Sequence, residues 1–568
     1  MGQSASKNFM EQRARSDTEH RKQDTLARNL VHEEFNRSIQ EVYDLRSGGL
    51  LGKGGFGTVR VVTHRMTKKK FALKTIELKD VKEQEEYTFL LNEIEIMKSL
   101  DHPNIARVQE VYHTPDYVYV VMDLYTGKDL FEAYRFRSEN DTARIVKTLV
   151  NALRYCHDKG IAHRDLKLEN VVFEHPGDNA QVKLVDFGLS ARFKEDQYRQ
   201  DLVGSWVYMA PDVINRHYQP MACDMWSMGI ITYCLLAGYP PFRSDNLKSL
   251  KNQIMKNEVS FKGHAWKHVS SDAKDFIHKL LAKNPTKRMT AQQAQQHVWL
   301  VKHTALNGKD TELDPEVVRN LMRFKTTTLM ERVALGVVAR TLEPEEMRLL
   351  EKEFHKVDRS NNGVISMEDF RTVLLRSERF DRSEVESVYT GLRLGTGGTI
   401  NFTEFMAATL SRHKLDERRL RYAFERLDHD NNGHLDYEDL LMTVGSDLST
   451  DEVRQAIKQF DHDGDGKVSF NEFFRGMLSA GQSLDALSTA HLTSTRLRQR
   501  SIKEGKSTIA ALAEMREREE QQLLANAAAA AAQGDAPWFG GDVSAGTYLG
   551  DSSRVSVGAA APATAGGR

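Results

Sequence analysis

The chain has 568 residues, of which 40% are hydrophobic and 28% are charged, and its formal net charge at pH 7 is −1. This length exceeds the roughly 250–300 residues that one hydrophobic core supports, so we expect more than one domain. The balanced charge gives no overall field that would favour nucleic acid, and the 3 cysteines lack metal or disulfide spacing, as is typical of a reducing, cytoplasmic compartment.

Residues 1–42 are polar and poor in aromatic side chains, which predicts a flexible or weakly helical extension. Their first six residues, Met-Gly-Gln-Ser-Ala-Ser, fit the N-myristoylation pattern with Gly2 as the acceptor. Many unmodified proteins also begin with Met-Gly, so the pattern does not decide between the two interpretations. Because one acyl chain gives only weak, reversible membrane binding, we expect at most a transient membrane association.

Residues 43–300 are predicted to form one domain with two lobes. Short β-branched runs over 58–63 and 117–122, with a charged helical stretch over 83–100, predict a small and mainly antiparallel lobe with one helix. After Thr126 the apolar spacing becomes helical, which predicts a larger α-helical lobe. We expect a cleft between the two lobes near residues 123–128.

A glycine-rich loop of the form Gly-x-Gly-x-x-Gly-x-Val begins at Gly52. Glycine lets backbone N–H groups approach phosphates closely, although such a loop is weak evidence by itself. Lys74 follows on a predicted strand, where it would neutralise phosphates, and Glu93 on the charged helix would pair with it. Either charge alone is also compatible with a solvated surface position. The predicted ATP-contacting set is Leu51, Gly52, Gly54, Gly57, Val59, Lys74, Glu93 and Asp123.

Two acidic motifs follow the loop, His-Arg-Asp-Leu-Lys-Leu-Glu-Asn over 163–170 and Asp-Phe-Gly over 186–188. In this order Asp165 is predicted to accept the proton of an attacking hydroxyl, and Lys167 to stabilise the transferring group. Asn170 and Asp186 are predicted to hold Mg²⁺. Phosphoryl transfer needs positioning and charge neutralisation more than covalent chemistry, so these residue types suffice. The ordered set resembles that of eukaryotic-type protein kinases.

The segment after Asp186 departs from the usual kinase pattern at two aspartates. Asp212 stands where glutamate is usual in the sequence Ala-Pro-Asp, so its predicted pair with Arg288 is expected to be looser. Asp201 offers a negative charge to Arg164, at a place where many kinases carry a phosphorylated threonine. We therefore predict activation without loop phosphorylation. The alternative is that Asp201 is a solvated loop residue.

Substrate preference is indicated by acidic residues near the predicted cleft. Asp129 and Glu169 stand where kinases that prefer basic peptides place acidic residues, which predicts an arginine upstream of the acceptor. Lys167 fits Ser/Thr acceptors rather than tyrosine. Met122 is the expected residue behind the adenine pocket.

An internal repeat with a period of 33–35 residues runs over 342–477, with aspartate-rich loops that start at 358, 393, 428 and 461. Calcium-binding EF-hand loops use positions 1, 3, 5, 7, 9 and 12, with glycine at position 6. The candidate ligands are Asp358, Ser360, Asn362, Val364, Ser366 and Asp369 in the first loop, Asp428, Asp430, Asn432, His434, Asp436 and Asp439 in the third, and Asp461, Asp463, Asp465, Lys467 and Glu472 in the fourth.

The loops differ in their predicted Ca²⁺ affinity. The first and third end in aspartate, which reaches a bidentate geometry less easily than glutamate, and the first has fewer carboxylates. We therefore rank the fourth above the third and the third above the first. The second loop, over 393–404, has lost its acidic ligands and is expected to bind no cation. It keeps Gly398 and the apolar Ile400, which predicts a short β contact with the first loop.

A connector over 301–342 carries apolar residues at helical intervals, namely Leu321, Phe324, Leu329, Val333, Val337 and Leu342. An opened EF-hand pair takes an amphipathic helix by such anchors, but permanent packing on the large lobe fits the spacing equally well. Beyond the EF-hand region of 343–480, residues 481–568 are helix-prone and then rich in Ala and Gly, and 533–568 are predicted to be disordered.

From these motifs, residues 42–480 resemble the calcium-dependent protein kinases of plants and protists. The resemblance implies an α+β protein in which a bilobal kinase precedes an all-α EF-hand domain. It also implies that Ca²⁺-loaded EF-hands capture the connector and so activate a Ser/Thr kinase that uses ATP and Mg²⁺ on protein substrates. Two alternatives remain: an inactive scaffold, and a kinase whose EF-hands do not gate activity.

Overall fold

The computed structural model describes residues 28–478, with gaps at 36, 55–56, 81–83, 134–137, 178–179, 194–197, 203, 305–311, 378–379, 394–397, 412–413 and 446–448. Segments 1–27 and 479–568 lie outside the described residues, and with them Gly2 and the predicted C-terminal tail.

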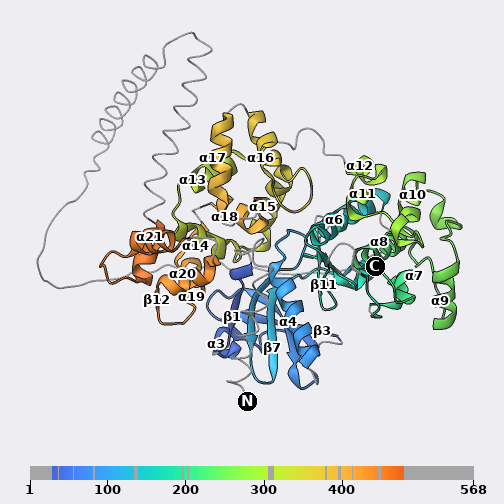
Figure 1. Ribbon diagram of the computed structural model, residues 1–568, viewed down its shortest axis with the longest axis horizontal. Coiled ribbons are helices and arrows are strands. Elements are labelled where there is room, and N and C mark those ends of the chain that lie inside the picture. Colours follow the sequence, from blue (N-terminus) through green and yellow to red (C-terminus); the bar gives the residue numbers. More distant parts are fainter. Residues whose placement is uncertain are drawn as a thin grey trace, which may run out of the picture. The chain divides into compact units, whose positions relative to one another are not determined.

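The small lobe is built on one seven-stranded sheet with a long helix beside it (Figure 1). Its elements are β1 (His32–Glu34), α3 (Ile39–Val42), β2 (Tyr43–Asp44), β3 (Leu50–Gly54), β4 (Gly57–His64), β5 (Lys70–Glu77), η1 (Leu78–Asp80), α4 (Gln84–Ser99), β6 (Val108–His113) and β7 (Tyr117–Asp123). The strand order is β1-β6-β7-β5-β4-β2, with β3 also paired to β4. All pairings are antiparallel except that of β1 with β6, so the predicted lobe is confirmed.

Valine-rich strands and α4 supply the core of this lobe. Val111, Val118 and Val120 are fully buried, and Ile94 of α4 is 1% exposed in the same cluster. β-Branched side chains suit a pleated sheet, and burying each one stabilises the fold by about 1.5–3 kcal/mol. This core fixes α4, and therefore Glu93, against the strand that carries Lys74.

The described residues 28–42 correct part of the prediction of a flexible or weakly helical extension over 1–42, because they form a strand as well as a short helix. β1 pairs with β6, with His32 opposite Glu110, and the neighbouring Val31 is 5% exposed. Strand β1 shows no apolar alternation in the sequence, so it could not be predicted from the pattern. Its buried carboxylate is balanced by a lysine that is distant in the chain. The Lys98 ammonium lies 2.7 Å from the Glu33 carboxylate, and both side chains are buried.

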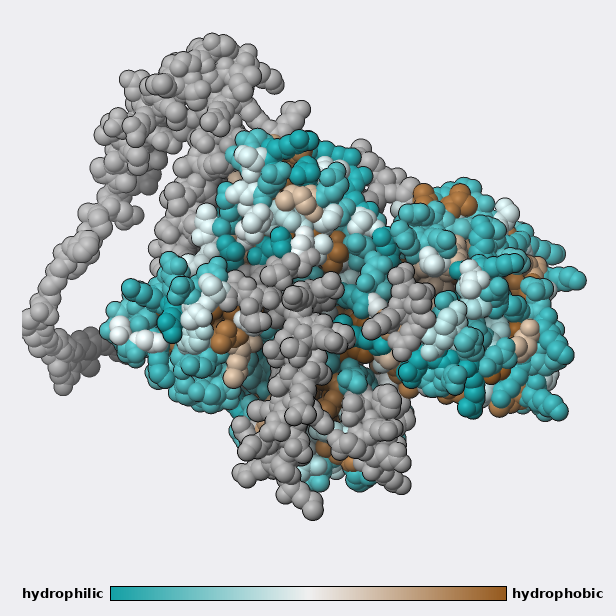
Figure 2. All heavy atoms as spheres, viewed as in Figure 1, coloured by the Kyte–Doolittle hydropathy of each residue, from teal (hydrophilic) through white to brown (hydrophobic). Residues whose placement is uncertain are grey.

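The large lobe is mainly helical. Its elements are α5 (Leu130–Ala133), α6 (Glu139–Asp158), β8 (Ile161–Ala162), η2 (Leu168–Asn170), β9 (Val171–Phe173), β10 (Val182–Leu184), β11 (Ala191–Arg192), η3 (Trp206–Tyr208), α7 (Pro211–Ile214), α8 (Pro220–Ala237), α9 (Leu247–Lys256), η4 (His264–Trp266), α10 (Ser271–Leu280), η5 (Pro285–Lys287), α11 (Ala291–Gln295) and α12 (Val298–His303). The surface of this lobe is largely hydrophilic, with an apolar patch over α12 (Figure 2) where Val298 and Val301 are exposed.

Helix α8 is the apolar centre of the large lobe. Among the described residues it alone is long and apolar enough to cross a membrane, and 78% of it is buried inside the fold. It packs against α6 and α10, and Trp226 within it is fully buried. These contacts are those of a core helix.

A second helical region follows the kinase-like lobes. Its elements are α13 (Pro315–Phe324), α14 (Leu329–Ala339), α15 (Pro344–Val357), α16 (Met367–Leu374), η6 (Leu375–Ser377), α17 (Arg382–Leu392), α18 (Phe402–Thr409), α19 (Glu417–Leu427), β12 (His434–Leu435), α20 (Tyr437–Val444), α21 (Thr450–Phe460) and β13 (Val468–Ser469). The predicted loop pairs form: Ile365 bridges Ile400, and Leu435 pairs with Val468. The whole described chain is therefore α+β, as predicted.

The connector helices α13 and α14 share one core with the helices that follow them. Helix α14 packs against α18, α19, α20 and α21, while α13 packs against α17 and α18. All six predicted anchors contribute to this core, five of them buried and Leu329 partly buried. The connector is thus enclosed by the repeat region.

Candidate active site and calcium-binding loops

The glycine-rich loop is the turn between β3 and β4, where Gly54 pairs with Gly57. Gly57 has φ 131°, and a Cβ there would lie 1.9 Å from the Thr75 carbonyl oxygen, so no other residue fits. A Cβ at Gly52 would meet nothing within 4 Å, which leaves room beside the strand. Leu51 is 52% exposed and Val59 is half-buried. Gly55 and Phe56 lie outside the described residues.

Lys74 joins the two lobes through ion pairs. Its ammonium lies 3.0 Å from the Glu93 carboxylate on α4 and 3.3 Å from that of Asp186 in the large lobe. Burial alone would lower the pKa of Lys74, but the charges of Glu93 and Asp186 raise it above its usual value. Lys74 is therefore a fixed cation. Asp186 remains 47% exposed and has a free face toward solvent.

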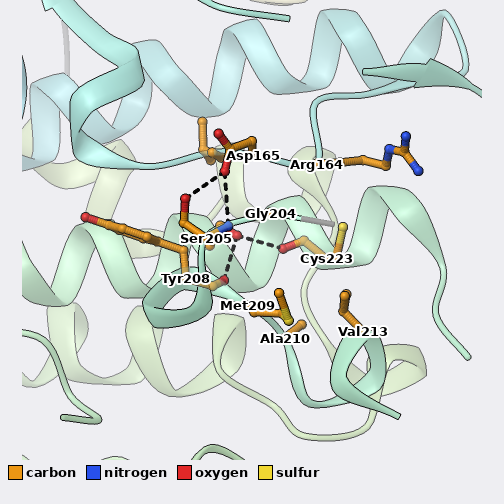
Figure 3. Close-up of a pocket in the computed structure, with 11 residues that line it drawn as sticks. Arg164, Asp165, Gly204, Ser205, Tyr208, Met209, Ala210, Val213 and Cys223 are labelled. Carbon is orange, nitrogen blue, oxygen red and sulfur yellow. Dashed lines mark hydrogen bonds between the residues drawn. The ribbon is translucent and has the colours of Figure 1, made fainter. Parts of the chain in front are cut away.

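Three neighbours hold Asp165, and Figure 3 shows one of them, Ser205. Lys167 Nζ donates to Asp165 Oδ2 at 2.6 Å, and Ser205 donates to Asp165 Oδ1 from its backbone N–H at 3.1 Å and its hydroxyl at 3.0 Å. Asn170 Nδ2 donates to the Asp165 carbonyl at 2.8 Å. The carboxylate is thus fixed in one orientation beside the chain that contains Ser205.

Two residues that matter for this geometry were not predicted to take part. Ser205 was missed, although a hydroxyl residue directly after Gly204 is a signal in the sequence. Asp224, 1% exposed in α8, accepts the backbone N–H of His163 at 2.9 Å and of Arg164 at 2.8 Å. Arg164 has φ 65°, an uncommon conformation that these bonds stabilise. No sequence spacing reports such backbone contacts.

The predicted partner of Arg164 is in place. Asp201 Oδ2 lies 2.5 Å from Arg164 Nη1, and Asp201 Oδ1 accepts from Arg199 Nε at 3.0 Å and from the Tyr218 hydroxyl at 3.1 Å. Partial burial opposes ionisation, but the hydrogen bonds from Arg199 and Arg164 lower the pKa of Asp201. Asp201 is therefore an ion-paired anion, not a solvated loop residue.

From this contact we predict that the unphosphorylated enzyme is active at saturating Ca²⁺, and that Asp201→Ala lowers kcat about tenfold. A hydrogen bond between charged groups contributes about 1.5–3 kcal/mol, and a loss of about 1.4 kcal/mol corresponds to a tenfold lower rate. Peptide turnover is measured on protein that mass spectrometry shows to be unphosphorylated. The exposed Asp245→Ala is the control, and an inert unphosphorylated wild type would refute the prediction.

The pair of Asp212 with Arg288 is tighter than predicted. Arg288 Nη2 lies 2.6 Å from Asp212 Oδ1, and both side chains are buried. Arg288 also donates to the carbonyls of Ala222 and Ala282 at 2.8 and 3.1 Å. These two bonds position the guanidinium, so the shorter aspartate side chain still reaches it.

At the end of β7, Asp123 turns its carboxylate into a buried polar cluster. Arg107 Nε donates to it at 3.0 Å and Gln109 Nε2 at 2.7 Å. This carboxylate is therefore committed to the cluster and is not available to a nucleotide. Met122 beside it is half-buried against the main core.

The acidic residues predicted to select substrates lie on two neighbouring elements. Asp129 directly precedes α5, and Glu169 lies in η2, which packs against α5. Glu169 is exposed and Asp129 is half-buried. The exposed Glu132 of α5 adds a third carboxylate that was not predicted. The arrangement is an anionic surface beside the catalytic loop.

In the fourth calcium loop, carboxylate oxygens of Asp461, Asp463 and Glu472 lie within 4.8 Å of one another. Burial alone would raise the pKa of Glu472, but hydrogen bonds from Ser469 and His462 lower it to about 2. Three ionisable oxygens that converge in this way fit a Ca²⁺ ion. Asp465 and Lys467 lie in the same loop, where the Lys467 N–H donates to Asp465 at 2.8 Å.

The third and first loops are weaker versions of this arrangement. Asp428, Asp430 and Asp439 also converge within 4.8 Å, but burial raises the pKa of Asp439 to about 6. In the first loop burial raises the pKa of Asp358 to about 7, and Ser360 bridges Asp358 and Asp369 with hydrogen bonds of 3.3 Å. The remaining predicted ligands, Asn362, Val364, Ser366, Asn432, His434 and Asp436, lie in their loops as expected. In the second loop residues 394–397 lie outside the described part.

For the calcium loops we predict that Glu472→Gln weakens the tightest Ca²⁺-binding event by about 10–100-fold, because it removes the single bidentate glutamate. Asp369→Asn should affect only the weakest event, since its loop has the fewest carboxylates. Isothermal calorimetry of the full-length variants measures both. The ranking is wrong if Asp369→Asn removes the tightest event.

The repeat region also contacts both lobes through buried polar groups. Asp101 accepts from Thr403 at the start of α18, 2.9 Å from its backbone N–H and 2.8 Å from its hydroxyl. Lys183 of the large lobe lies 2.5 Å from Glu351 of α15. Beside these contacts Arg340, at the end of the connector helix α14, donates to the Val108 carbonyl in the small lobe. These contacts were not predicted, because each joins residues more than 150 positions apart.

The fold and these sites define a protein kinase with EF-hand calcium-binding repeats. Comparison with family models gives a protein kinase domain over residues 45–300, an EF hand over 350–375 and an EF-hand domain pair over 417–478. Calcium-dependent protein kinase 12 of Arabidopsis thaliana is 35% identical over 410 residues, which cover 71% of this chain and 83% of the relative.

Two further relatives give the same result. Calcium-dependent protein kinase 21 of Arabidopsis thaliana is 34% identical over 78% of this chain and 83% of its own length. Calcium-dependent protein kinase 11 of Oryza sativa subsp. japonica is 34% identical over 73% of this chain and 72% of its own length. The chain belongs to the calcium-dependent protein kinase family. It is a calcium-regulated Ser/Thr protein kinase that uses ATP, Mg²⁺ and Ca²⁺.

Proposed function

We propose that Asp165 accepts the proton of a substrate Ser or Thr hydroxyl as that oxygen attacks the γ-phosphorus of ATP. The new oxygen–phosphorus bond forms as the bond to the bridging oxygen breaks, and ADP leaves with the electron pair. The observation that carries this role is the fixed carboxylate, held by Lys167 and Ser205 within hydrogen-bonding distance. Lys167, 3.4 Å from the Ser205 hydroxyl, would stabilise the transferring group.

The residues around Asp165 fit ATP and Mg²⁺. Lys74 would pair with the phosphates, and Asn170 and the half-exposed Asp186 would hold Mg²⁺. Mg²⁺ supplies neutralisation of phosphate charge when bound. The open space at Gly52 supports a position for phosphates beneath the glycine-rich loop. Leu51, Gly54, Gly57 and Val59 on the same two strands would complete the nucleotide surface.

We further propose that substrates carry arginine three residues before the acceptor. The exposed Glu169 and the nearby Asp129 support this preference, since a guanidinium pairs well with carboxylates. Both elements that carry them adjoin the catalytic loop.

For this preference we expect an Arg-x-x-Ser peptide to exceed its Ala-x-x-Ser counterpart about tenfold in kcat/KM. Glu169→Gln should reduce that ratio to about two- to threefold, as the loss of a partly exposed ion pair requires. Steady-state kinetics at saturating Ca²⁺ measures the ratio, and the exposed Glu258→Gln is the control. Equal turnover of both peptides by the wild type would contradict the proposal.

We propose that Ca²⁺ activates the enzyme by stabilising the arrangement in which the EF-hand region encloses α14. In this arrangement Thr403 binds Asp101 of the small lobe and Glu351 binds Lys183 of the large lobe, so the region bridges the two. The bridge supports a role in holding the lobes in their catalytic orientation. The connector would then support the kinase rather than merely inhibit it, and without Ca²⁺ the bridge would be lost.

Gly2 lies outside the described residues, so the sequence pattern alone supports its acylation. We propose a cytoplasmic enzyme with weak, reversible membrane association through a single acyl chain on Gly2. Mass spectrometry of the N-terminal peptide from a cell that contains the transferase would detect the added acyl mass.

A further inference from the structure

Ser205 binds the catalytic aspartate, and Trp206 follows it in the chain. Both hydrogen bonds from Ser205 end on Asp165, so a substrate hydroxyl that reaches Asp165 also lies beside Ser205. Trp206 is the next residue and begins η3, and neighbouring Cα atoms are about 3.8 Å apart. The segment that lies beside Asp165 therefore also carries Trp206.

A lysine covers the Trp206 ring. The ammonium of Lys251, on α9, lies 4.2 Å from the centroid of the indole. Trp206 is partly buried and packs against the core of the large lobe, so its position is fixed by the fold. A cation over an aromatic face is attracted by the ring quadrupole. Among the described residues, no carboxylate lies within 4.0 Å of the Lys251 ammonium.

Helix α9 differs in charge from the anionic surface of Asp129, Glu132 and Glu169. Its sequence is LKSLKNQIMK, with three lysines and no acid. In the sequence, the nearest acidic residues on either side of the helix are the exposed Asp245 and Glu258. The surface around α9 is mainly hydrophilic (Figure 2).

We propose that Lys251, positioned by Trp206, selects substrates with an acidic side chain at the first or second position after the acceptor. An extended peptide advances about 3.3 Å per residue, so these positions lie about 3–7 Å beyond the acceptor. A carboxylate there would pair with an ammonium that meets no carboxylate of the described residues within 4.0 Å. The inference rests on the proposed function, because it assigns the peptide's upstream half to the acidic surface.

The experiment compares kcat/KM for Arg-x-x-Ser-Glu and Arg-x-x-Ser-Ala peptides at saturating Ca²⁺ with the full-length enzyme. We expect the wild type to favour the acidic peptide about three- to fivefold, as a partly exposed ion pair allows. Lys251→Ala should bring the ratio close to one. Lys251→Glu should reverse the preference in favour of an Arg-x-x-Ser-Lys peptide. A purely structural role of Lys251 would not reverse the preference.

Lys256→Ala is the matched control, because Lys256 is exposed at the last turn of the same helix. It should leave the ratio unchanged. Added salt should reduce the wild-type preference, since exposed charges are screened. Equal turnover of the acidic and neutral peptides, or a preference for an Arg-x-x-Ser-Phe peptide that survives in Lys251→Ala, would overturn the inference. Failure of the wild type to phosphorylate any of these peptides would instead refute the proposed function.

Discussion

Lys74→Met should lower peptide phosphorylation by about 10²–10³-fold at saturating Ca²⁺ and ATP. The substitution keeps the length of the side chain but removes the cation that lies between Glu93 and Asp186. Electrostatic groups placed where phosphate charge develops contribute about this much to catalysis. Glu93, whose side chain is 7% exposed, would also lose its ion-pair partner, and this should shift α4 from its position.

The matched control is Lys70→Met, the same substitution at the exposed start of the same strand. Its turnover should remain within about twofold of the wild type, since surface substitutions rarely change stability by more than about 0.5 kcal/mol. Circular dichroism and a melting curve establish that both variants fold. A folded Lys74→Met enzyme with normal turnover would contradict the catalytic role and favour the interpretation of the chain as a scaffold.

Removal of the chain after residue 310 should abolish activity rather than release it. The cut deletes the partner of Asp101 and the nearer of the two carboxylates beside Lys183, and with them the bridge between the lobes. We therefore expect at least a tenfold fall in kcat/KM relative to the Ca²⁺-loaded full-length enzyme, measured with the Arg-x-x-Ser peptide.

A milder variant separates loss of support from loss of folding. Thr403→Val keeps the shape of the side chain but removes the hydroxyl that donates to Asp101. It should lower Ca²⁺-stimulated turnover severalfold in the full-length chain, since a hydrogen bond to a charged group contributes about 1.5–3 kcal/mol. Full constitutive activity of the truncated protein would contradict the supporting role and establish an inhibitory connector.

The local parts of the site could be predicted because each was carried by residues close in the sequence. The glycine-rich loop, the segment around Asp165 and the carboxylates of the fourth calcium loop are all of this kind. The ion pairs of Lys74 with Glu93 and of Arg164 with Asp201 were also predicted, since characteristic motifs mark both members. The paired loops followed from one apolar position, represented by Ile400.

What could not be predicted depends on contacts between distant residues. Asp224 acts on backbone N–H groups, which leave no pattern in the sequence. The strand at His32 is polar and is stabilised by Lys98, far along the chain. Thr403 lies in the repeat that lost its calcium ligands, yet its helix is bound by Asp101, 302 residues earlier. The enclosure of α14 likewise required the packing of α18, α19, α20 and α21 to be known.

Calcium control of turnover is measured by phosphorylation of the Arg-x-x-Ser peptide in saturating Ca²⁺ and in excess chelator. Mg²⁺ and ATP are kept constant in both. We expect at least a tenfold higher rate with Ca²⁺, and loss of most of this stimulation in Glu472→Gln. Equal rates with Ca²⁺ and with chelator would contradict it, and would leave a kinase whose EF-hands do not gate its activity.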